Sequence, residues 1–411
     1  MHPGGQASCC AVSIAEHHFG AYRQRLSSAI DSERCTLDWT LRCTNALEGP
    51  RAVRAAARPI APGLTMIRCF SLAARLAAGL VVAGLMAGCE RPPIEAEQSG
   101  FRGTGMAQIY NPRTLASQAG LHAAPEIDAP ARVRPGGPKA GDVYQNVKVL
   151  GDLSLAEFGR TMNAITNWVS PGQSCAYCHV EGNFADDSKY TKVVARRMIQ
   201  MTQHLNADWK PHVGETGVTC YTCHRGAPLP QPLWFRPVPD TAHPVLGDRA
   251  GQNAPAAVVG LSSLPNEVLS HYLLSDKDAR TIRVASDQAL PSGNTRSIKQ
   301  AEHTYGLMMH MSQSLGVNCT FCHNTRNFAS WDESRPQRAT AWHGIRMVRD
   351  INQSYLEPLS TALPTLPTGR LGPLGDSAKV ACGTCHKGAN KPLNGAAMAV
   401  HYPAMTGAQT P

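Results

Sequence analysis

The sequence contains the pattern C-x-x-C-H four times, and no other feature constrains the chain as strongly. Two thiols one helical turn apart can add to the two vinyl groups of one porphyrin. The adjoining imidazole then lies under the iron as its proximal ligand. With 14 Cys and 16 His in 411 residues, chance gives roughly 0.02 such patterns per chain. The four motifs are Cys175–His179, Cys220–His224, Cys319–His323 and Cys382–His386.

These motifs predict four covalently bound c-type haems. A dithiol redox pair or a zinc knuckle also uses C-x-x-C, but neither needs a His directly after every second Cys. All eight Cys after residue 89 belong to the motifs. The predicted attachment residues are Cys175, Cys178, Cys220, Cys223, Cys319, Cys322, Cys382 and Cys385, and the predicted proximal iron ligands are His179, His224, His323 and His386.

The composition fits a loop-rich protein whose core is largely cofactor. Only 17% of the residues are charged and 6% are aromatic, whereas Gly (36) and Pro (30) are abundant. The formal net charge is +9, but part of it lies near the N-terminus and haem propionates add negative charge, so we predict no nucleic-acid partner. Covalent haem implies assembly outside the cytoplasm, and an export signal is therefore expected.

The N-terminal part of the chain reads as an extension followed by that signal. Residues 1–65 have no clear hydrophobic period and are expected to be a disordered or misassigned extension. Residues 66–88 have the charges and the short apolar run of a lipoprotein-type signal peptide. Cys89 is then the predicted lipid-attachment residue, although Met86 stands where a Leu is usual. A retained N-terminal helix or ordinary cleavage is the alternative. The expected protein is anchored to a membrane and does not span it.

Composition and helical patterning divide the remainder into four predicted parts. Residues 89–142 are rich in Pro, Gly and Ala and are expected to form an extended N-terminal arm, with folded structure beginning near Val143. Residues 143–228 should hold the first and second haems. Residues 229–295 are expected to be a connector, and residues 296–411 should hold the third and fourth haems and a C-terminal tail.

Amphipathic patterns predict a helix before each motif, at 151–170, 189–206, 301–315 and 337–356. Ser154 with Glu157 suggests a capping box for the first helix. The second and fourth helices share a local pattern, Arg197-Met198-Ile199 and Arg346-Met347-Val348. We therefore predict a mainly α fold with long irregular loops. The expected architecture is a multihaem cytochrome c of four helix–turn–CxxCH units in two pseudo-two-fold-related pairs.

Each of these helices offers a Met as a sixth iron ligand, and Met/His ligation raises the haem potential relative to bis-His ligation. A helical Met is usually core packing, but the repeat favours the ligand role for Met162, Met198 and Met308. Met309 and Met311 are the rivals of Met308. At the fourth site the residues alone leave three candidates open, namely Met347, His212 and His343.

Longer stretches of the sequence resemble the tetrahaem cytochrome c subunit of the photosynthetic reaction centre of purple bacteria. The resemblance covers roughly Cys89 to Tyr402. The stretches that carry it are 147–151, 158–168, 194–198, 212–226, 315–324, 342–352 and 391–393.

That resemblance implies three Met/His haems and one bis-His haem, with Met347 in the core and a lipid on Cys89. It pairs Met162 with His179, Met198 with His224, Met308 with His323, and His212 with His386.

The resemblance also implies a function at the periplasmic side of the photosynthetic inner membrane. A soluble cytochrome c or high-potential iron–sulfur protein would supply an electron at the haem of the first motif. The haem of the third motif would reduce the photo-oxidised special pair held by the L and M subunits.

Two other classes of function compete with this one. A multihaem enzyme needs an iron with an open coordination position, whereas every haem here has a candidate sixth ligand, so we expect an electron-transfer subunit and no enzyme. A general periplasmic electron shuttle would carry the same haems but would not bind a reaction centre.

Overall fold

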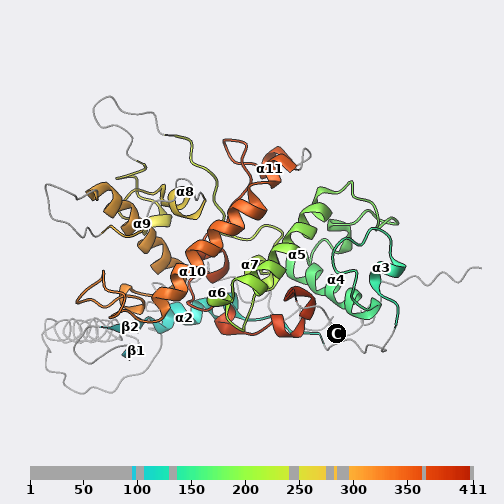
Figure 1. Cartoon of the computed structure of the whole chain (residues 1–411), viewed down its shortest axis with the longest axis horizontal. Helices are drawn as coiled ribbons and strands as arrows, with labels where there is room; N and C mark the ends of the chain where they lie inside the picture. Colours follow the sequence, from blue (N-terminus) through green and yellow to red (C-terminus); the bar gives the residue numbers. More distant parts are fainter. Residues whose placement is uncertain are drawn as a thin grey trace, which may run out of the picture. The chain divides into compact units, whose positions relative to one another are not determined.

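The computed structural model describes residues 95–98, 106–128, 137–239, 250–274, 282–284, 296–362 and 367–407. The predicted extension at 1–65, the signal peptide at 66–88 and Cys89 lie outside this part of the chain. The described part is mainly helical with long loops (Figure 1), which confirms the predicted fold class at that level. None of its helices is both long and apolar enough to cross a bilayer.

The strands and the α-helices are β1 (Glu95–Gln98), β2 (Ala107–Tyr110), α2 (Pro112–Gln118), α3 (Ala140–Val143), α4 (Leu155–Val169), α5 (Tyr190–Asp208), α6 (Lys210–Val213), α7 (Cys220–His224), α8 (Val268–Leu273), α9 (Ile298–Leu315), α10 (Gln337–Asp350), α11 (Leu359–Ala362) and α12 (Cys382–His386). The other helical turns are η1 (Ala119–His122), η2 (Cys175–Tyr177), η3 (Ala257–Val259), η4 (Cys319–Phe321), the π-helix η5 (Ile351–Leu356), η6 (Thr368–Arg370), η7 (Pro392–Gly395), η8 (Ala399–His401) and η9 (Pro403–Met405).

The four predicted long helices are present as α4, α5, α9 and α10, and the last continues into η5. Local capping sets where two of them begin. Ser154 Oγ accepts the backbone N–H of Glu157 at the start of α4, at 3.2 Å. Ser297 and Gln300 form a full capping box at the start of α9, so this helix begins three residues before the predicted start.

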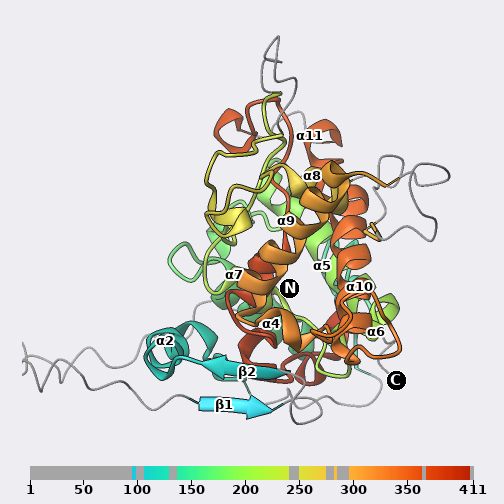
Figure 2. The ribbon, with the colours of Figure 1, turned by 90° about the vertical axis from the view of Figure 1, so that its left-hand side faces the viewer.

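Regular structure is also present before Val143, near which the sequence predicts that folded structure begins. β1 and β2 pair antiparallel (Figure 2), and β2 lies against the third motif. The Gln108 side chain accepts the Asn318 N–H at 2.9 Å, and the backbone oxygen of Ala107 accepts from the side chains of Asn318 and Thr320. This part of the predicted arm therefore packs on its own chain.

Buried apolar side chains form two clusters. The smaller cluster joins α4, α5 and α7 to the C-terminal segment, through residues that include Trp168, Ile199 and Tyr402. The larger cluster joins α9, α10 and η5 to α8. Tyr272 and Leu273 of α8 are fully buried. The segment predicted as a connector thus contributes a helix to the core.

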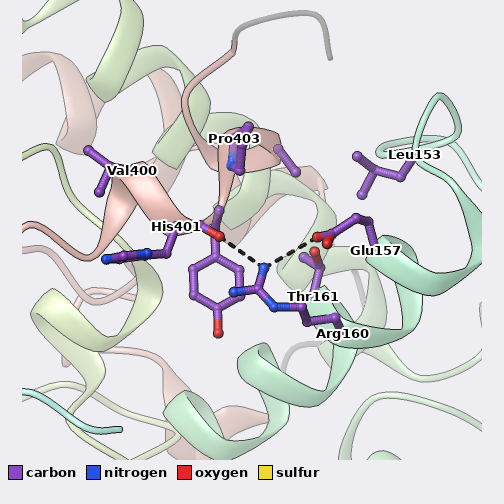
Figure 3. Close-up of a pocket in the computed structure, with 9 residues that line it drawn as sticks. Leu153, Glu157, Arg160, Thr161, Val400, His401 and Pro403 are labelled. Carbon is purple, nitrogen blue, oxygen red and sulfur yellow. Dashed lines mark hydrogen bonds and ion pairs between the residues drawn. The ribbon is translucent and has the colours of Figure 1, made fainter. Parts of the chain in front are cut away.

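Arg160 of α4 fixes the C-terminal segment on that helix, beside a pocket of about 290 Å³ (Figure 3). Its guanidinium lies 4.0 Å from the ring centroid of Tyr402 and donates to the His401 backbone oxygen at 2.9 Å. It also pairs with the Glu157 carboxylate at 3.2 Å and donates to the Asp128 backbone oxygen at 2.8 Å. A buried cation with these partners is satisfied, so we assign Arg160 a structural role.

His204 of α5 contacts one carboxylate on its own helix and one on α10, and the second contact connects the two helices. Its Nδ1 lies 2.6 Å from Asp208 and its Nε2 lies 2.7 Å from Asp350. The Tyr355 ring packs 5.6 Å from the imidazole. Burial lowers the pKa of His204, but the hydrogen bonds to Asp350 and Asp208 outweigh burial and raise its pKa above the ordinary value. The link is therefore strongest when His204 is protonated.

A His204→Gln variant should lose stability at about pH 6 and lose little at about pH 9. Because the folded-state pKa is raised, the stabilisation is fully present below the unfolded pKa and disappears as the pH rises through the folded pKa. We expect about 1 kcal/mol at most, since solvent still reaches the imidazole. Urea unfolding midpoints at both pH values test this, with His401→Gln as the control on an exposed His. An equal loss at both pH values would contradict the charged link.

Candidate haem-binding sites

The first and third motifs each occupy a short 3-10 turn, η2 and η4. In both, the motif His is held by a backbone oxygen five residues further on. The Nδ1 of His179 lies 3.2 Å from the Phe184 oxygen, and the Nδ1 of His323 lies 3.1 Å from the Phe328 oxygen. The two Phe side chains are half exposed.

The second and fourth motifs each form a five-residue helix, α7 and α12. Here the oxygen that accepts from the His lies three residues further on. The Nδ1 of His224 lies 2.9 Å from the Ala227 oxygen, and the Nδ1 of His386 lies 2.9 Å from the Ala389 oxygen. A carbonyl that accepts from Nδ1 fixes the imidazole tautomer and leaves Nε2 for a metal. All four predicted proximal ligands are thus oriented as iron ligands need to be.

Burial keeps these imidazoles neutral, which is the form that binds a metal. It lowers the pKa of His386 to about 4, and it lowers the pKa of His179, His224 and His323 as well. The residues present therefore fit a haem iron in both geometry and protonation.

Six motif Cys are free thiols, and burial makes some of them poor acids. It raises the pKa of Cys220 to about 12 and the pKa of Cys322 and Cys382 to about 11. A redox-active dithiol has a lowered thiol pKa, so these environments do not favour the dithiol alternative. Within the described ranges, no three His, Cys, Asp or Glu side chains gather into a metal site made of protein ligands alone, as a zinc knuckle would need.

The other two motif Cys, Cys223 and Cys385, form a disulfide with a Cα–Cα distance of 4.4 Å. A sulfur in a disulfide cannot also carry a thioether bond to haem. Haem attachment at these two residues therefore requires the disulfide to be reduced first. The short Cα–Cα distance also means that the second and fourth motifs lie against each other.

The three favoured Met ligands are half-buried on their helices, Met162 on α4, Met198 on α5 and Met308 on α9. The end of the rival Met309 lies near Gly260, close to η3. Met311 packs beside Met308 against the larger apolar cluster.

His212 lies on α6 beside the fourth motif. Its ring centroid is 6.0 Å from that of His386, and the ring planes are inclined at 66°. A metal–imidazole bond of about 2 Å on each side puts two axial rings roughly 6 Å apart. The Nδ1 of His212 lies 3.0 Å from the Thr340 oxygen, which leaves its Nε2 for a metal. The two rings thus have the spacing that two axial ligands of one metal ion need.

The other candidates for the fourth site are placed differently. Met347 is 7% exposed and belongs to the larger apolar cluster. The ring of His343 packs against Trp342, 4.9 Å between centroids. Gly344 of α10 gives the His212 ring its room, because a Cβ there would lie 2.5 Å from His212 Cε1. The sequence did not indicate Gly344 as part of this site, because a glycine has no side chain that would mark a functional position.

Comparison with known proteins decides the family. A family model described as "Photosynthetic reaction centre cytochrome C subunit" matches residues 90–406. The chain belongs to this family. The reaction centre cytochrome c subunit of Rubrivivax gelatinosus is 55% identical over 332 residues, which cover 80% of this chain and 88% of the relative. That of Thermochromatium tepidum is 50% identical over 331 residues, 80% of each chain. That of Roseobacter denitrificans is 41% identical over 329 residues, 76% of this chain and 86% of the relative.

Family membership confirms the resemblance that the sequence suggested. As a reaction centre cytochrome c subunit, the chain carries covalently bound c-type haem, associates with the reaction centre and takes part in electron transfer there.

Proposed function

We propose that the chain holds four c-type haems and passes electrons through them from a soluble donor to the photo-oxidised special pair. The observation that carries this proposal is the shared orientation of the four motif His, each with Nδ1 held by a backbone oxygen. The haems supply the redox chemistry, while the protein sets their axial ligands and surroundings. Such a subunit is no enzyme, because each iron has two protein ligands.

The proposed iron ligands are Met162 with His179, Met198 with His224, Met308 with His323, and His212 with His386. The 6.0 Å between the rings of the last pair supports bis-His ligation at the fourth haem. The burial of Met347 supports a packing role for that side chain. Thioether bonds from the eight motif Cys hold the haems.

We also propose two pseudo-two-fold-related pairs of helix–turn–CxxCH units, in residues 143–228 and 296–411. The matching His contacts of the first and third motifs, and of the second and fourth, support this repeat. So does the packing of the short motif helices. Helix α7 contacts α4 and α5, whereas α12 contacts α9 and α10, and α7 and α12 contact each other.

We propose that the haems follow the order first, second, fourth and third, with the contact between α7 and α12 in support. The second and fourth lie in the middle, where Cys223 and Cys385 meet. The first and third motifs, at the proposed ends of the chain of haems, are each followed by a half-exposed Phe. The order fits a chain of haems that takes up an electron at the first motif and delivers it from the third.

The proposed donor is a soluble cytochrome c or a high-potential iron–sulfur protein, and the proposed acceptor side is the L and M subunits. The chain would lie on the periplasmic side of the photosynthetic membrane, held by a lipid on Cys89 after removal of residues 66–88.

Flash-induced absorbance of native membranes, followed at the c-type haem band, tests the proposal. We expect haem oxidation within microseconds of the flash, and this signal should persist after soluble cytochromes are washed away. If four reduced, intact haems show no fast oxidation, the chain serves another partner as a general electron shuttle.

A further inference from the structure

Two buried Asn side chains hold the segments that lead into the second and fourth motifs. Asn206 of α5 accepts the Val218 N–H at 2.7 Å and donates to the Val218 oxygen at 2.9 Å. Asn352 of η5 accepts the Val380 N–H at 2.9 Å and donates to the Val380 oxygen at 3.0 Å. Both Val residues stand two positions before the first Cys of their motif. We call these contacts the Asn bridges.

Each bridge also reaches a third segment. The second amide hydrogen of Asn206 goes to the Met405 oxygen at 2.7 Å, and that of Asn352 goes to the Leu273 oxygen at 2.8 Å. Asn206 is 6% exposed and Asn352 is fully buried. A carboxamide offers two donors and an acceptor, and all are used here. An ionised Asp has no hydrogen-bond donor, and Leu has neither a donor nor an acceptor. Gln has the same carboxamide on a side chain that is longer by one methylene group.

Each bridge connects two parts of one proposed haem site. One part is the helical element associated with the distal ligand, and the other is the segment that leads to the proximal His. Asn206 follows the proposed ligand Met198 by eight residues on the same helix, about two turns. Asn352 follows α10 directly, and α10 seats the ring of His212 through Thr340 and Gly344.

We propose that Asn206 and Asn352 are positioning residues that set the distance between the two axial ligands of the second and fourth haems. The inference rests on the proposed function, because it uses the ligand pairs assigned there. The first and third motifs are held by other contacts, such as those of Asn318 with β2. Each bridge should therefore act on one haem and leave the other three unchanged.

The test is a redox titration of full-length, haem-loaded protein in reaction centres, with electron paramagnetic resonance and near-infrared spectra of the ferric haems. Asn206→Leu should weaken the Met-to-iron charge-transfer band of one haem and shift that haem's oxidised-to-reduced ratio at least tenfold, about 59 mV for one electron. Asn352→Leu should shift only the bis-His haem. Unchanged potentials, or a similar shift of all four, would overturn the proposal.

Two further variants separate positioning from general destabilisation. Arg160→Leu removes buried hydrogen bonds elsewhere and should lower the unfolding midpoint without a shift confined to the second or fourth haem. Asn206→Asp keeps the acceptor for the Val218 N–H but loses both donors, to the Val218 and Met405 oxygens, so it should change the same haem as Asn206→Leu. If Asn206→Leu does not accumulate, Asn206→Asp takes its place in the redox titration. Unchanged haem potentials in that variant, or a similar shift of all four potentials, would contradict the proposal. The spectra of the wild-type protein test the proposed function independently of the bridges. They should show three Met/His haems and one bis-His haem.

Discussion

Replacing Cys319 and Cys322 with Ala should leave a reaction centre whose bound cytochrome no longer reduces the special pair within microseconds of a flash. This variant loses the third haem, which we propose to be the donor to the special pair. Large exposed rings near this motif support a partner surface there, because exposed apolar side chains gathered in one region mark interaction sites. They are Phe328, whose ring lies 5.4 Å from that of His323, and Trp331, and each is 50% exposed.

The local structure should survive the substitution. η4 is held to β2 by Asn318 and Thr320, and neither residue is changed. We therefore expect three haems per chain, normal association with the reaction centre and the loss of essentially the whole fast phase. Flash-induced absorbance and haem content measure this directly.

The matched control removes the haem at the other end, through Cys175→Ala with Cys178→Ala. That variant should keep the fast phase on the first flash but should recover slowly between flashes, because the proposed site of electron uptake is gone. If it loses the fast phase while the Cys319 and Cys322 variant keeps it, the proposed direction of electron flow is reversed.

The features that the sequence predicts well are the local ones. Each C-x-x-C-H motif is five consecutive residues, and the helices show a 3.6-residue period that tertiary contacts do not obscure. The proximal His could therefore be predicted from the motifs alone. The residues whose backbone oxygens contact the His Nδ1 atoms could also have been predicted, because they lie in repeated dipeptides. Asn-Phe recurs at 183–184 and 327–328, and Gly-Ala recurs at 226–227 and 388–389.

The features that the sequence could not predict depend on contacts between distant segments. The arm residue Gln108 meets Asn318 through a backbone N–H that any residue type would offer, so no composition signal marks the contact. Helix α8 is only six residues long, too short for a periodic pattern. His212 is seated by Thr340, 128 residues away. Residues alone therefore left the fourth site open, and family resemblance was needed to choose His212.

His212→Met should convert the fourth haem from bis-His to Met/His ligation and raise its potential. We expect a rise of at least about 59 mV, a tenfold shift in the oxidised-to-reduced ratio, because a thioether ligand raises the potential of a haem relative to a second imidazole. A fourth Met-to-iron charge-transfer band should appear in the near-infrared spectrum. Redox titration and spectra of the purified reaction centre measure both changes.

Gly344→Ala makes the same test without removing the ligand. The new Cβ would lie 2.5 Å from Cε1 and 2.8 Å from Nδ1 of His212, so the ring must move and lose its contact with Thr340. Ala also favours a helix interior by about 1 kcal/mol over Gly. A change confined to the bis-His haem would then reflect the displaced ring and not a weakened helix.

Met347→Leu is the control that separates the two candidate ligands. Leu fills a similar volume in the larger apolar cluster, so the spectra of all four haems should stay as in wild type. If Met347→Leu instead removes a Met band, Met347 is bound to iron and the His212 assignment is wrong. If His212→Met and Gly344→Ala both change the fourth haem while Met347→Leu does not, the 6.0 Å separation of the His212 and His386 rings is that of two axial ligands.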